Sequence, residues 1–381
     1  MNGPLHGVRV IELAGLGPAP FCSMVLADLG ADVLRIDRPR ADPPEGPRTN
    51  AWDVLNRNRL GVAVDLRSAG GAGFVAELAA DADVLIEGFR PGVAERLGLG
   101  PDPLREANPR LVYGRMTGWG QEGPMASRAG HDLTYLALSG ALAHIGRADQ
   151  PPTPPLNLVA DFGGGGMLLA MGVLAALVER SSSGVGQVVD AAMVDGAALL
   201  MAPLFGAWSW GFWNEARGTN LLDSGAPFYD VYECSDGRWL AIAALEAPFY
   251  AQLLDGLGLA GDETLPDQND SARWPELHDR IAAVVLTRSR DEWAEHFAGT
   301  DACVAPVLTM GEAPEHPHAV ARAAFADVEG VVQPAAAPRF DRTPAGPPSA
   351  AVEGADAAEV LAPWGVDADR VAALRTEGIL T

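Results

Sequence analysis

The sequence predicts an α/β protein: a large domain with an open parallel, Rossmann-like sheet, and a smaller α+β domain. Short β-branched runs alternate with helical patterns, first as a strand over residues 8–13, a helix over 19–29 and a strand over 32–37. Such strand–helix–strand units build open parallel sheets. A hairpin signal, Ser235-Asp236-Gly237, lies between two later strand-like runs and indicates the smaller domain. The 381 residues, 48% of them hydrophobic, suffice for one large domain or two.

The remaining elements follow from the same periodicity. In the large domain we expect strands over residues 61–66, 83–87, 111–116 and 187–191, and helices over 72–80, 131–145, 162–180 and 193–210. In the smaller domain we expect strands over 229–234, 238–244 and 303–308, and helices over 248–257, 275–286 and 290–297. The proline-rich residues 41–53 indicate a surface loop, and residues 339–351 indicate an extended surface segment.

Changes in this pattern predict the domain boundaries. Residues 1–212 form the first part of the large domain, and the polar, weakly periodic residues 213–228 form a crossing linker. Residues 229–312 form the small α+β domain. Residues 313–381 are expected to be a return linker and a C-terminal segment that rejoins the large domain.

Composition excludes several functions. The formal net charge of −23 argues against a nucleic-acid partner, because a phosphate backbone needs a basic face. The sequence contains no lysine, so all 27 basic residues are arginine. This excludes a Schiff-base lysine and a phosphate-binding loop that ends in Lys-Ser/Thr. A small anionic ligand remains possible, since it needs only a few well-placed arginines.

The cysteines and the apolar runs predict where the protein works. Cys22, Cys234 and Cys303 lie far apart without a CxxC spacing, which is typical of free buried thiols in a reducing compartment. No signal peptide precedes the first strand. The longest apolar runs, 163–178 and 197–213, are shorter than the roughly 20 residues that a membrane span needs. We therefore expect a soluble, cytoplasmic protein with no membrane partner.

Two features lie where the predicted strands end. The turn Gly15-Leu16-Gly17-Pro18 invites a dinucleotide-binding interpretation, but Pro20 replaces the third glycine of that motif and Pro18 lacks an N–H. A tight turn into a helix is the better interpretation. Arginines also recur just past successive strands, and ligands bind at this edge of open α/β sheets. One such arginine is an ordinary surface charge, whereas four in the same topological position indicate a phosphate-rich ligand: Arg38, Arg67, Arg90 and Arg96.

His131 and Asp161 are the candidate catalytic pair. Each is predicted to stand at the start of an apolar helix, where backbone N–H groups are unpaired and the helix dipole is positive. An imidazole and a carboxyl group at two such ends could face one substrate carbon from two sides, one as base and one as acid. Taken singly, His131 could merely bind backbone and Asp161 could be a plain helix N-cap.

Several longer runs are similar to a known family. Residues 7–13, 26–32 and 83–87 resemble the family III CoA-transferases. The runs that start at Gly130-His131-Asp132 and at Asp161-Phe162-Gly163, together with residues 186–193, resemble the racemase branch of that family. The match covers residues 3–345, which is nearly the whole chain.

The resemblance implies an interlocked homodimer, in which each chain threads the other, and a CoA thioester substrate with no metal and no cofactor. It implies that His131 and Asp161 are the active-site pair and that Glu246 holds the histidine. Asn157 and Tyr229 are weaker supporting candidates. The implied contacts to CoA are Arg38, Val64, Asp65, Leu66, Arg67, Gly88, Phe89, Arg90, Arg96, Gly130, His131, Asp132, Leu133, Thr134 and Tyr135.

The implied reaction is the racemisation of 2-methylacyl-CoA thioesters, a reaction of lipid metabolism. One group removes the Cα proton and the other returns a proton on the opposite face, through an enolate that the backbone N–H of Asp132 could stabilise. Asp161 must hold a proton for half of the cycle, and burial beside Phe162 would raise its pKa. Two alternatives stay open. Asp132 could be the nucleophile of a CoA-transferase that moves CoA between carboxylic acids, or the chain could be a catalytically idle CoA-binding protein.

Overall fold

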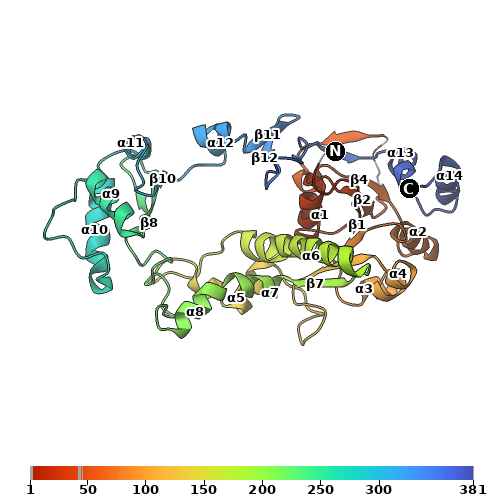
Figure 1. Ribbon diagram of the computed structural model, residues 1–381, viewed down its shortest axis with the longest axis horizontal. Coiled ribbons are helices and arrows are strands. Elements are labelled where there is room, and N and C mark those ends of the chain that lie inside the picture. Colours follow the sequence, from red (N-terminus) through yellow and green to blue (C-terminus); the bar gives the residue numbers. More distant parts are fainter. Residues whose placement is uncertain (1–2, 42–43, 45, 381) are drawn as a thin grey trace. The chain divides into compact units, whose positions relative to one another are not determined.

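The computed structural model describes residues 3–41, 44 and 46–380, so part of the predicted loop over residues 41–53 lies outside the described residues. The chain divides into two compact units (Figure 1). The larger unit comprises the chain up to Ser139, Leu156–Leu200 and the chain from Pro317 on, and the smaller unit comprises Gly140–Pro155 and Met201–His316. The domain boundaries expected from the sequence stay a prediction.

A six-stranded parallel sheet forms the centre of the larger unit, as the sequence predicts. Its order is β4-β2-β1-β5-β6-β7, and in its register Val10 of β1 pairs with Val33 of β2 on one side and with Val84 of β5 on the other. The order of the strands reverses between β1 and β5, and ligands of open α/β sheets bind at such a point. The bounds are β1 Arg9–Leu13, β2 Asp32–Asp37, β4 Leu60–Ala63, β5 Val84–Glu87, β6 Val112–Thr117 and β7 Val188–Ala192.

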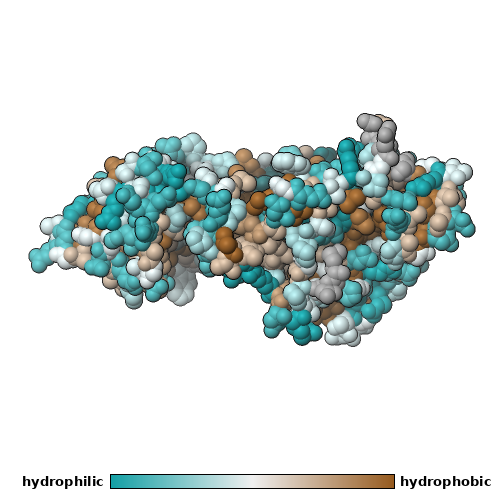
Figure 2. All heavy atoms as spheres, turned by 90° about the horizontal axis from the view of Figure 1, so that it is seen from above, coloured by the Kyte–Doolittle hydropathy of each residue, from teal (hydrophilic) through white to brown (hydrophobic). Residues whose placement is uncertain are grey.

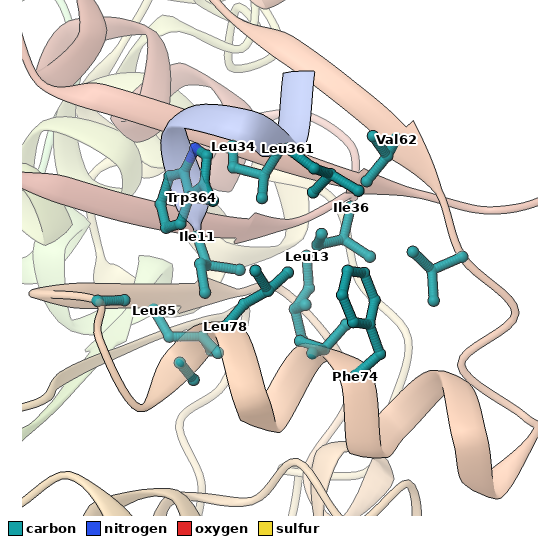
Figure 3. Close-up of a cluster of buried hydrophobic side chains, with 14 of the residues drawn as sticks. Ile11, Leu13, Leu34, Ile36, Val62, Phe74, Leu78, Leu85, Leu361 and Trp364 are labelled. Carbon is teal, nitrogen blue, oxygen red and sulfur yellow. The ribbon is translucent and has the colours of Figure 1, made fainter. Parts of the chain in front are cut away.

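One face of the sheet carries the main hydrophobic core (Figure 3). Alternate side chains of β1 and β2, Ile11 and Leu13 with Leu34 and Ile36, point to this face and pack against Phe74. Burying each such side chain stabilises the fold by roughly 1.5–3 kcal/mol. The helices that contribute to this core are α2 Ala69–Ala79, α4 Pro101–Ala107, α13 Ala357–Leu361 and α14 Ala368–Thr376. The short η6 Ala362–Trp364 lies between α13 and α14 and also contributes to the core.

Helices on the opposite face carry the candidate site. They are α1 Pro18–Asp28, a π-helix η3 Leu158–Met167, and α6 Leu168–Ser183, which continues η3 and packs on β6 and β7. Against η3 lie α5 Asp132–Ser139 and α7 Met193–Leu200. The short helix α3 Val93–Arg96 follows β5, and the short η1 Val54–Asn56 precedes β4.

Three predicted helices have different bounds in the structure. The helix expected over 131–145 ends at Ser139, because Gly140 adopts a positive φ of 87° that stops it, and only the short η2 Leu142–His144 follows. The helix expected over 162–180 starts earlier, as η3, and the one over 193–210 is divided into α7 and α8 Ala202–Ser209. Pro203 lies in the first turn of α8, where a proline is tolerated but cannot continue the preceding helix.

A glycine run allows η3 to pack unusually close to its neighbours. A Cβ atom on Gly164 would lie 2.7 Å from the backbone nitrogen of Ala197 in α7, and one on Gly166 would lie 2.7 Å from the carbonyl oxygen of Pro18 in α1. Real Cβ atoms do not approach backbone this closely, so glycine is required at both positions. The glycine run therefore lets the backbones of α1 and α7 pack directly against η3.

The smaller unit contains a three-stranded antiparallel sheet in the order β10-β9-β8, and its β8–β9 pair is the hairpin that the turn signal predicts. On the face drawn in Figure 2, this unit, at the left, is covered mainly by hydrophilic residues. Its elements are β8 Tyr229–Glu233, β9 Trp239–Ala243, α9 Ala247–Leu257, η4 Ser271–Arg273, α10 Trp274–Val285, α11 Arg290–His296, β10 Val304–Pro306 and η5 Ala313–Glu315.

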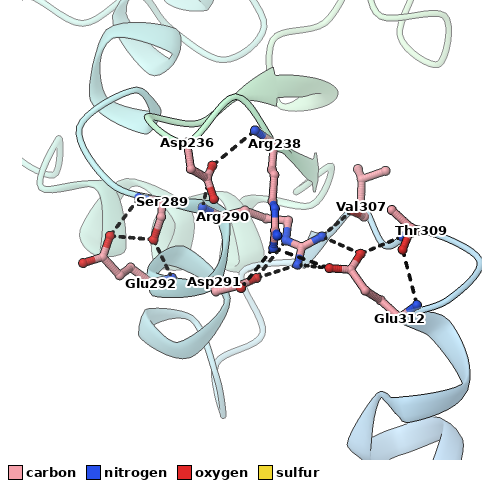
Figure 4. Close-up of polar contacts among 9 residues, drawn as sticks. All are labelled: Asp236, Arg238, Ser289, Arg290, Asp291, Glu292, Val307, Thr309 and Glu312. Carbon is pink, nitrogen blue, oxygen red and sulfur yellow. Dashed lines mark hydrogen bonds and ion pairs between the residues drawn. The ribbon is translucent and has the colours of Figure 1, made fainter.

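A network of charges ties α11 to the segment after β10 (Figure 4). The buried Arg290 donates to both carboxylate oxygens of Glu312, at 3.0 and 2.8 Å, and to the carbonyl oxygen of Val307 at 3.0 Å. Ser289 and Glu292 form a capping box at the start of α11. The network therefore fixes the chain where it leaves the small sheet.

The larger unit also has two small antiparallel sheets. One pairs β11 Phe325–Val328 with β12 Val331–Pro334, after α12 Pro317–Ala321. The other pairs β3 Arg48–Asn50 with β13 Ala351–Glu353. The prediction of a plain loop over 41–53 is therefore wrong at β3, because a strand of three residues takes its partner from the far end of the chain.

Two further predictions need correction. Cys303 is exposed, whereas Cys22 and Cys234 are buried; all three thiols are free. The helical segment Leu158–Ser183 has 26 residues, contains an 18-residue window with a mean hydropathy of 1.7, and is longer than the apolar run recognised in the sequence. By length and composition alone it could cross a membrane, a property that it shares with core helices of soluble proteins.

Candidate active site

A cavity of about 440 Å³ opens at the carboxyl edge of the parallel sheet, where the strand order reverses. The turns that follow β1, β5 and β6 form its walls, together with the segment before α5, Tyr135 and Met193. Both His131 and Asp161 line it. The cavity therefore brings together the two groups that the sequence singled out, at the place where this class of sheet binds ligands.

Asp161 lies in the first turn of η3 and is not its N-cap, as the plainer interpretation expected; Asn157 occupies that position. The Asn157 side chain donates to Asp161 Oδ2 at 3.3 Å. Burial raises the pKa of the Asp161 carboxyl group, and the negative charge of Asp132 raises it further. The hydrogen bond from Asn157 and the charge of His131 lower this pKa. The direction is the one that an acid holding its proton near neutral pH requires.

Asp132 is the first residue of α5, and its carboxylate is turned toward η3. Its Oδ2 accepts the backbone N–H groups of Ala160 at 2.9 Å and of Asp161 at 2.8 Å. The side chain is buried, and Asp132 is not found among the described residues that line the cavity. Its backbone N–H, at the first position of a helix, has no acceptor within that helix.

His131 immediately precedes α5 and is exposed. Its backbone N–H donates to Thr134 Oγ1 at 3.1 Å, and the Thr134 hydroxyl group donates to the His131 carbonyl oxygen at 2.8 Å. This reciprocal pair fixes the turn that presents the imidazole to the cavity. Thr134, which the resemblance implied as a CoA contact, thus has a local structural partner, and Leu133 is exposed.

Tyr135 forms part of the cavity wall, between two glycines. A Cβ atom on Gly130 would lie 2.6 Å from its ring, and the ring also lies against Gly118. The ring meets Trp119 edge-on at 4.7 Å. Burial raises the pKa of Tyr135 to about 12, and the nearby charge of Asp161 acts in the same direction. The hydroxyl group therefore keeps its proton at neutral pH.

A second cavity, of about 550 Å³, lies beside the first. Phe89 lines both cavities. The turn that carries Phe89 is held by its own N–H, which donates to Glu87 Oε2 at 2.6 Å, while Glu87 is ion-paired with Arg115 at 2.9 Å. Other residues lining the second cavity include Arg38, Val64, Asp65, Leu66, Arg67, Val93 and Leu97. A groove thus leads from Arg38 to His131.

The two cavities contain cations without partners. Among the residues that the structure describes, Arg38, Arg90 and Arg128 have guanidinium groups with no ion pair or hydrogen bond, and all three line this groove. Arg96 lies beside it, with its guanidinium group against Gly92. The groove is therefore positive in a protein of net charge −23. Arg128 was missed in the sequence because it follows no strand; its place three residues before His131 was the available signal.

Similarity to known proteins over nearly the whole chain decides the family. A model of CoA-transferase family III matches residues 5–356. The chain belongs to CoA-transferase family III. It is 46% identical to the alpha-methylacyl-CoA racemase of Mus musculus, in an alignment that covers 99% of this chain and 97% of the mouse protein. It is also 46% identical to the alpha-methylacyl-CoA racemase of Homo sapiens, over 90% of this chain and 88% of the human protein. A solved CAIB/BAIF family protein from Brucella suis is 26% identical with a TM-score of 0.77, over 99% of this chain and 100% of that one.

The smaller unit of this family III chain contains the other two predicted site residues. Glu246 directly precedes α9, and Tyr229 begins β8. Burial raises the pKa of the Cys303 thiol, and the charge of Glu246 adds to this, so these two residues are neighbours within the unit. The proposed support of His131 by Glu246 stays a prediction, as does the role of Tyr229. Within the described part of the chain, no group of three or more His, Cys, Asp or Glu side chains could hold a metal ion.

Proposed function

We propose that this family III protein is a cofactor-independent racemase of 2-methylacyl-CoA thioesters. The observation that carries the proposal is that the imidazole of His131 and the carboxyl group of Asp161 line one cavity. The names of the mouse and human relatives support the same reaction.

The chemistry uses two groups in opposite protonation states. In one direction neutral His131 removes the Cα proton and protonated Asp161 returns a proton on the other face; in the reverse direction the Asp161 carboxylate is the base and the imidazolium is the acid. The intermediate is an enolate. The backbone N–H of Asp132 is the donor for its oxygen, and loss of such a donor typically costs about 10²–10³ in rate. No step needs a metal or a cofactor, because the thioester itself acidifies the Cα–H bond.

The groove that continues from this cavity suits the CoA part of the substrate. Its unpaired guanidinium groups at Arg38 and Arg90 are matched to phosphate oxygens, with Arg67 beside them. The acyl chain would extend over the apolar side of the first cavity, where Met116 and Met193 lie. This arrangement supports the predicted CoA contacts at Arg38, Arg67, Arg90 and in the turns between them.

CoA transfer is the weaker candidate. It would need the Asp132 carboxylate as a nucleophile facing the thioester, and one oxygen of that carboxylate already accepts two backbone N–H groups in a buried place. A catalytically idle CoA-binding protein is disfavoured by the presence of both His131 and Asp161 at the cavity.

We also propose that the enzyme is cytoplasmic, belongs to lipid metabolism and works as an interlocked homodimer. In the larger unit, Met167, Met171 and Val178 form an exposed stripe along one face of η3 and α6, with 46%, 59% and 72% of their surfaces accessible. The spacing puts these side chains on one side of the helix. An apolar stripe of this kind is typical of a surface that a second copy of the chain covers.

A single incubation in D₂O tests the proposed reaction. One pure enantiomer of a 2-methylacyl-CoA should lose optical activity without any additive, and deuterium should enter at Cα. A requirement for a second carboxylic acid, with no deuterium incorporated, would establish transfer instead and refute the racemase proposal.

A further inference from the structure

We infer that the Asp132 side chain is the positioning residue for Asp161: it holds the backbone of Asp161 in place and puts a second negative charge behind its carboxyl group. This inference rests on the proposed racemase function and deepens it. It gives Asp132 a role that its residue type alone does not indicate, since the same carboxylate would be a nucleophile in CoA transfer.

The first part of the argument is the start of η3. The first N–H groups of a helix lack acceptors within the helix. Asn157 holds the N-cap position but makes no side-chain cap bond. The N–H groups of Ala160 and Asp161 instead donate to Asp132 Oδ2, from a residue 28 or 29 positions earlier in the chain. Because Ala160 and Asp132 are buried, water does not replace this acceptor if the carboxylate is removed.

The second part is the rigidity of the rest of η3. Gly164 packs against the backbone of α7 at Ala197, and Gly166 packs against the backbone of α1 at Pro18. These contacts fix η3 after Asp161, while Asp132 fixes it at Asp161 itself. The Asp161 side chain, which accepts a hydrogen bond from Asn157, lines the cavity. A displacement of about 1 Å of such a group is enough to lower a rate by about 10²-fold.

The third part is electrostatic. The groups that act on Asp161 are Asp132 from α5, His131 just before α5 and Asn157 before η3, and Tyr135 is the other titratable neighbour. A like charge favours the protonated carboxyl group, whereas the Asn157 hydrogen bond and His131 favour the carboxylate. Burial is the largest cause of the raised pKa of Asp161, and the charge of Asp132 adds to it. Removing that charge should make Asp161 a stronger acid.

Two substitutions separate the two roles. Asp132→Asn keeps an oxygen acceptor but removes the charge, whereas Asp132→Ala removes both. Asp195→Asn is the matched control, because Asp195 is an exposed acid in the first turn of α7, the helix that also packs on η3. The readouts are amide hydrogen exchange over residues 157–167 and the pH profiles of kcat and kcat/KM for both enantiomers.

In Asp132→Ala, we expect exchange at the Ala160 and Asp161 amides to accelerate at least about 10-fold and kcat to fall about 10²-fold, with KM changed less. In Asp132→Asn, these amides should stay protected. For the enantiomer that uses the Asp161 carboxylate as base, activity falls as the pH drops through the pKa of Asp161. The acid limb should therefore move to lower pH, by about one unit.

Unchanged amide exchange in Asp132→Ala would overturn the positioning role. An acid limb in Asp132→Asn that coincides with that of wild type and of Asp195→Asn would overturn the electrostatic role, even if the alanine variant fails to fold. The exchange measurement requires no activity, so its outcome is independent of the D₂O incubation. A wild-type protein that protects both amides but exchanges no Cα proton would leave the positioning role standing and refute only the racemase function.

Discussion

The Asp132 carboxylate and the backbone of Asp161 are joined by a hydrogen bond of 2.8 Å, although the two residues lie 29 positions apart. Asp132 starts α5 directly after His131, and Asp161 lies in the first turn of η3. One bond therefore connects the two segments that carry the candidate acid and base.

His131→Ala and Asp161→Ala should each lower the racemisation rate by at least about 10²–10⁴-fold, the typical contribution of a positioned acid or base. Binding of the CoA thioester should change only a few-fold, because the arginines of the groove remain. Deuterium incorporation at Cα and calorimetric titration measure the two quantities. His6→Ala is the control, because His6 is exposed and lies far from His131 and Asp161 in the sequence. Retained deuterium exchange in either site variant would exclude that residue from proton transfer.

Arg90→Ala and Arg38→Ala should raise KM for the acyl-CoA by about 10–100-fold with little change in kcat. A hydrogen bond to a charged group contributes about 1.5–3 kcal/mol, which corresponds to that range. Steady-state kinetics at constant ionic strength measures the change. Arg322→Ala is the matched control, since Arg322 is exposed and does not line either cavity. If all three variants had the same KM, the groove would not be the CoA site.

Gly164→Ala should lower the free energy of unfolding by about 1–3 kcal/mol, because its new Cβ atom would press on the backbone of α7. Gly73→Ala is the same substitution in α2, where a Cβ atom would have no neighbour within 4 Å. It should instead stabilise the protein by about 0.5–1 kcal/mol, since glycine inside a helix is unfavourable. Urea unfolding curves measure both. Equal effects would show that close packing of η3 on α7 is not required.

Glu312→Gln should destabilise the protein at about pH 7 and have a smaller effect at about pH 3. Hydrogen bonds from Arg290 hold the pKa of Glu312 well below its usual range. A carboxyl group with a depressed pKa in the folded state contributes stability above its unfolded pKa, and this contribution is lost as the pH falls through the folded pKa. Unfolding in urea at the two pH values measures the difference. Glu295→Gln, on the exposed side of α11, should show no such pH dependence.

Much of the fold was predictable because local patterns and the sheet agree. The strands of a parallel sheet are buried on both faces, so Val84 to Ile86 and similar runs stand out as short apolar stretches. The arginines past these strands then fall on one edge by topology alone, which is why Arg38, Arg67 and Arg90 could be grouped before any coordinates.

The π-helix could not be predicted in the same way. Four glycines in a row weaken a helix locally, and they are tolerated here because α1 and α7 press on both sides of η3. The strand β3 was missed for a similar reason: its three residues pair with β13, about 300 positions later. In both cases the stabilising partner is remote in the sequence.

The sequence by itself determined the parallel sheet, the residue types of the site and the positive edge on which a phosphate-rich ligand would lie. Only the tertiary structure decided which of two nearby acids is available for chemistry. Asp161 faces the cavity, whereas Asp132 is occupied by the backbone of η3. The physical reason is burial: the Asp132 carboxylate is enclosed against two backbone N–H groups of η3 and does not line the cavity, and η3 lies far from Asp132 in the sequence.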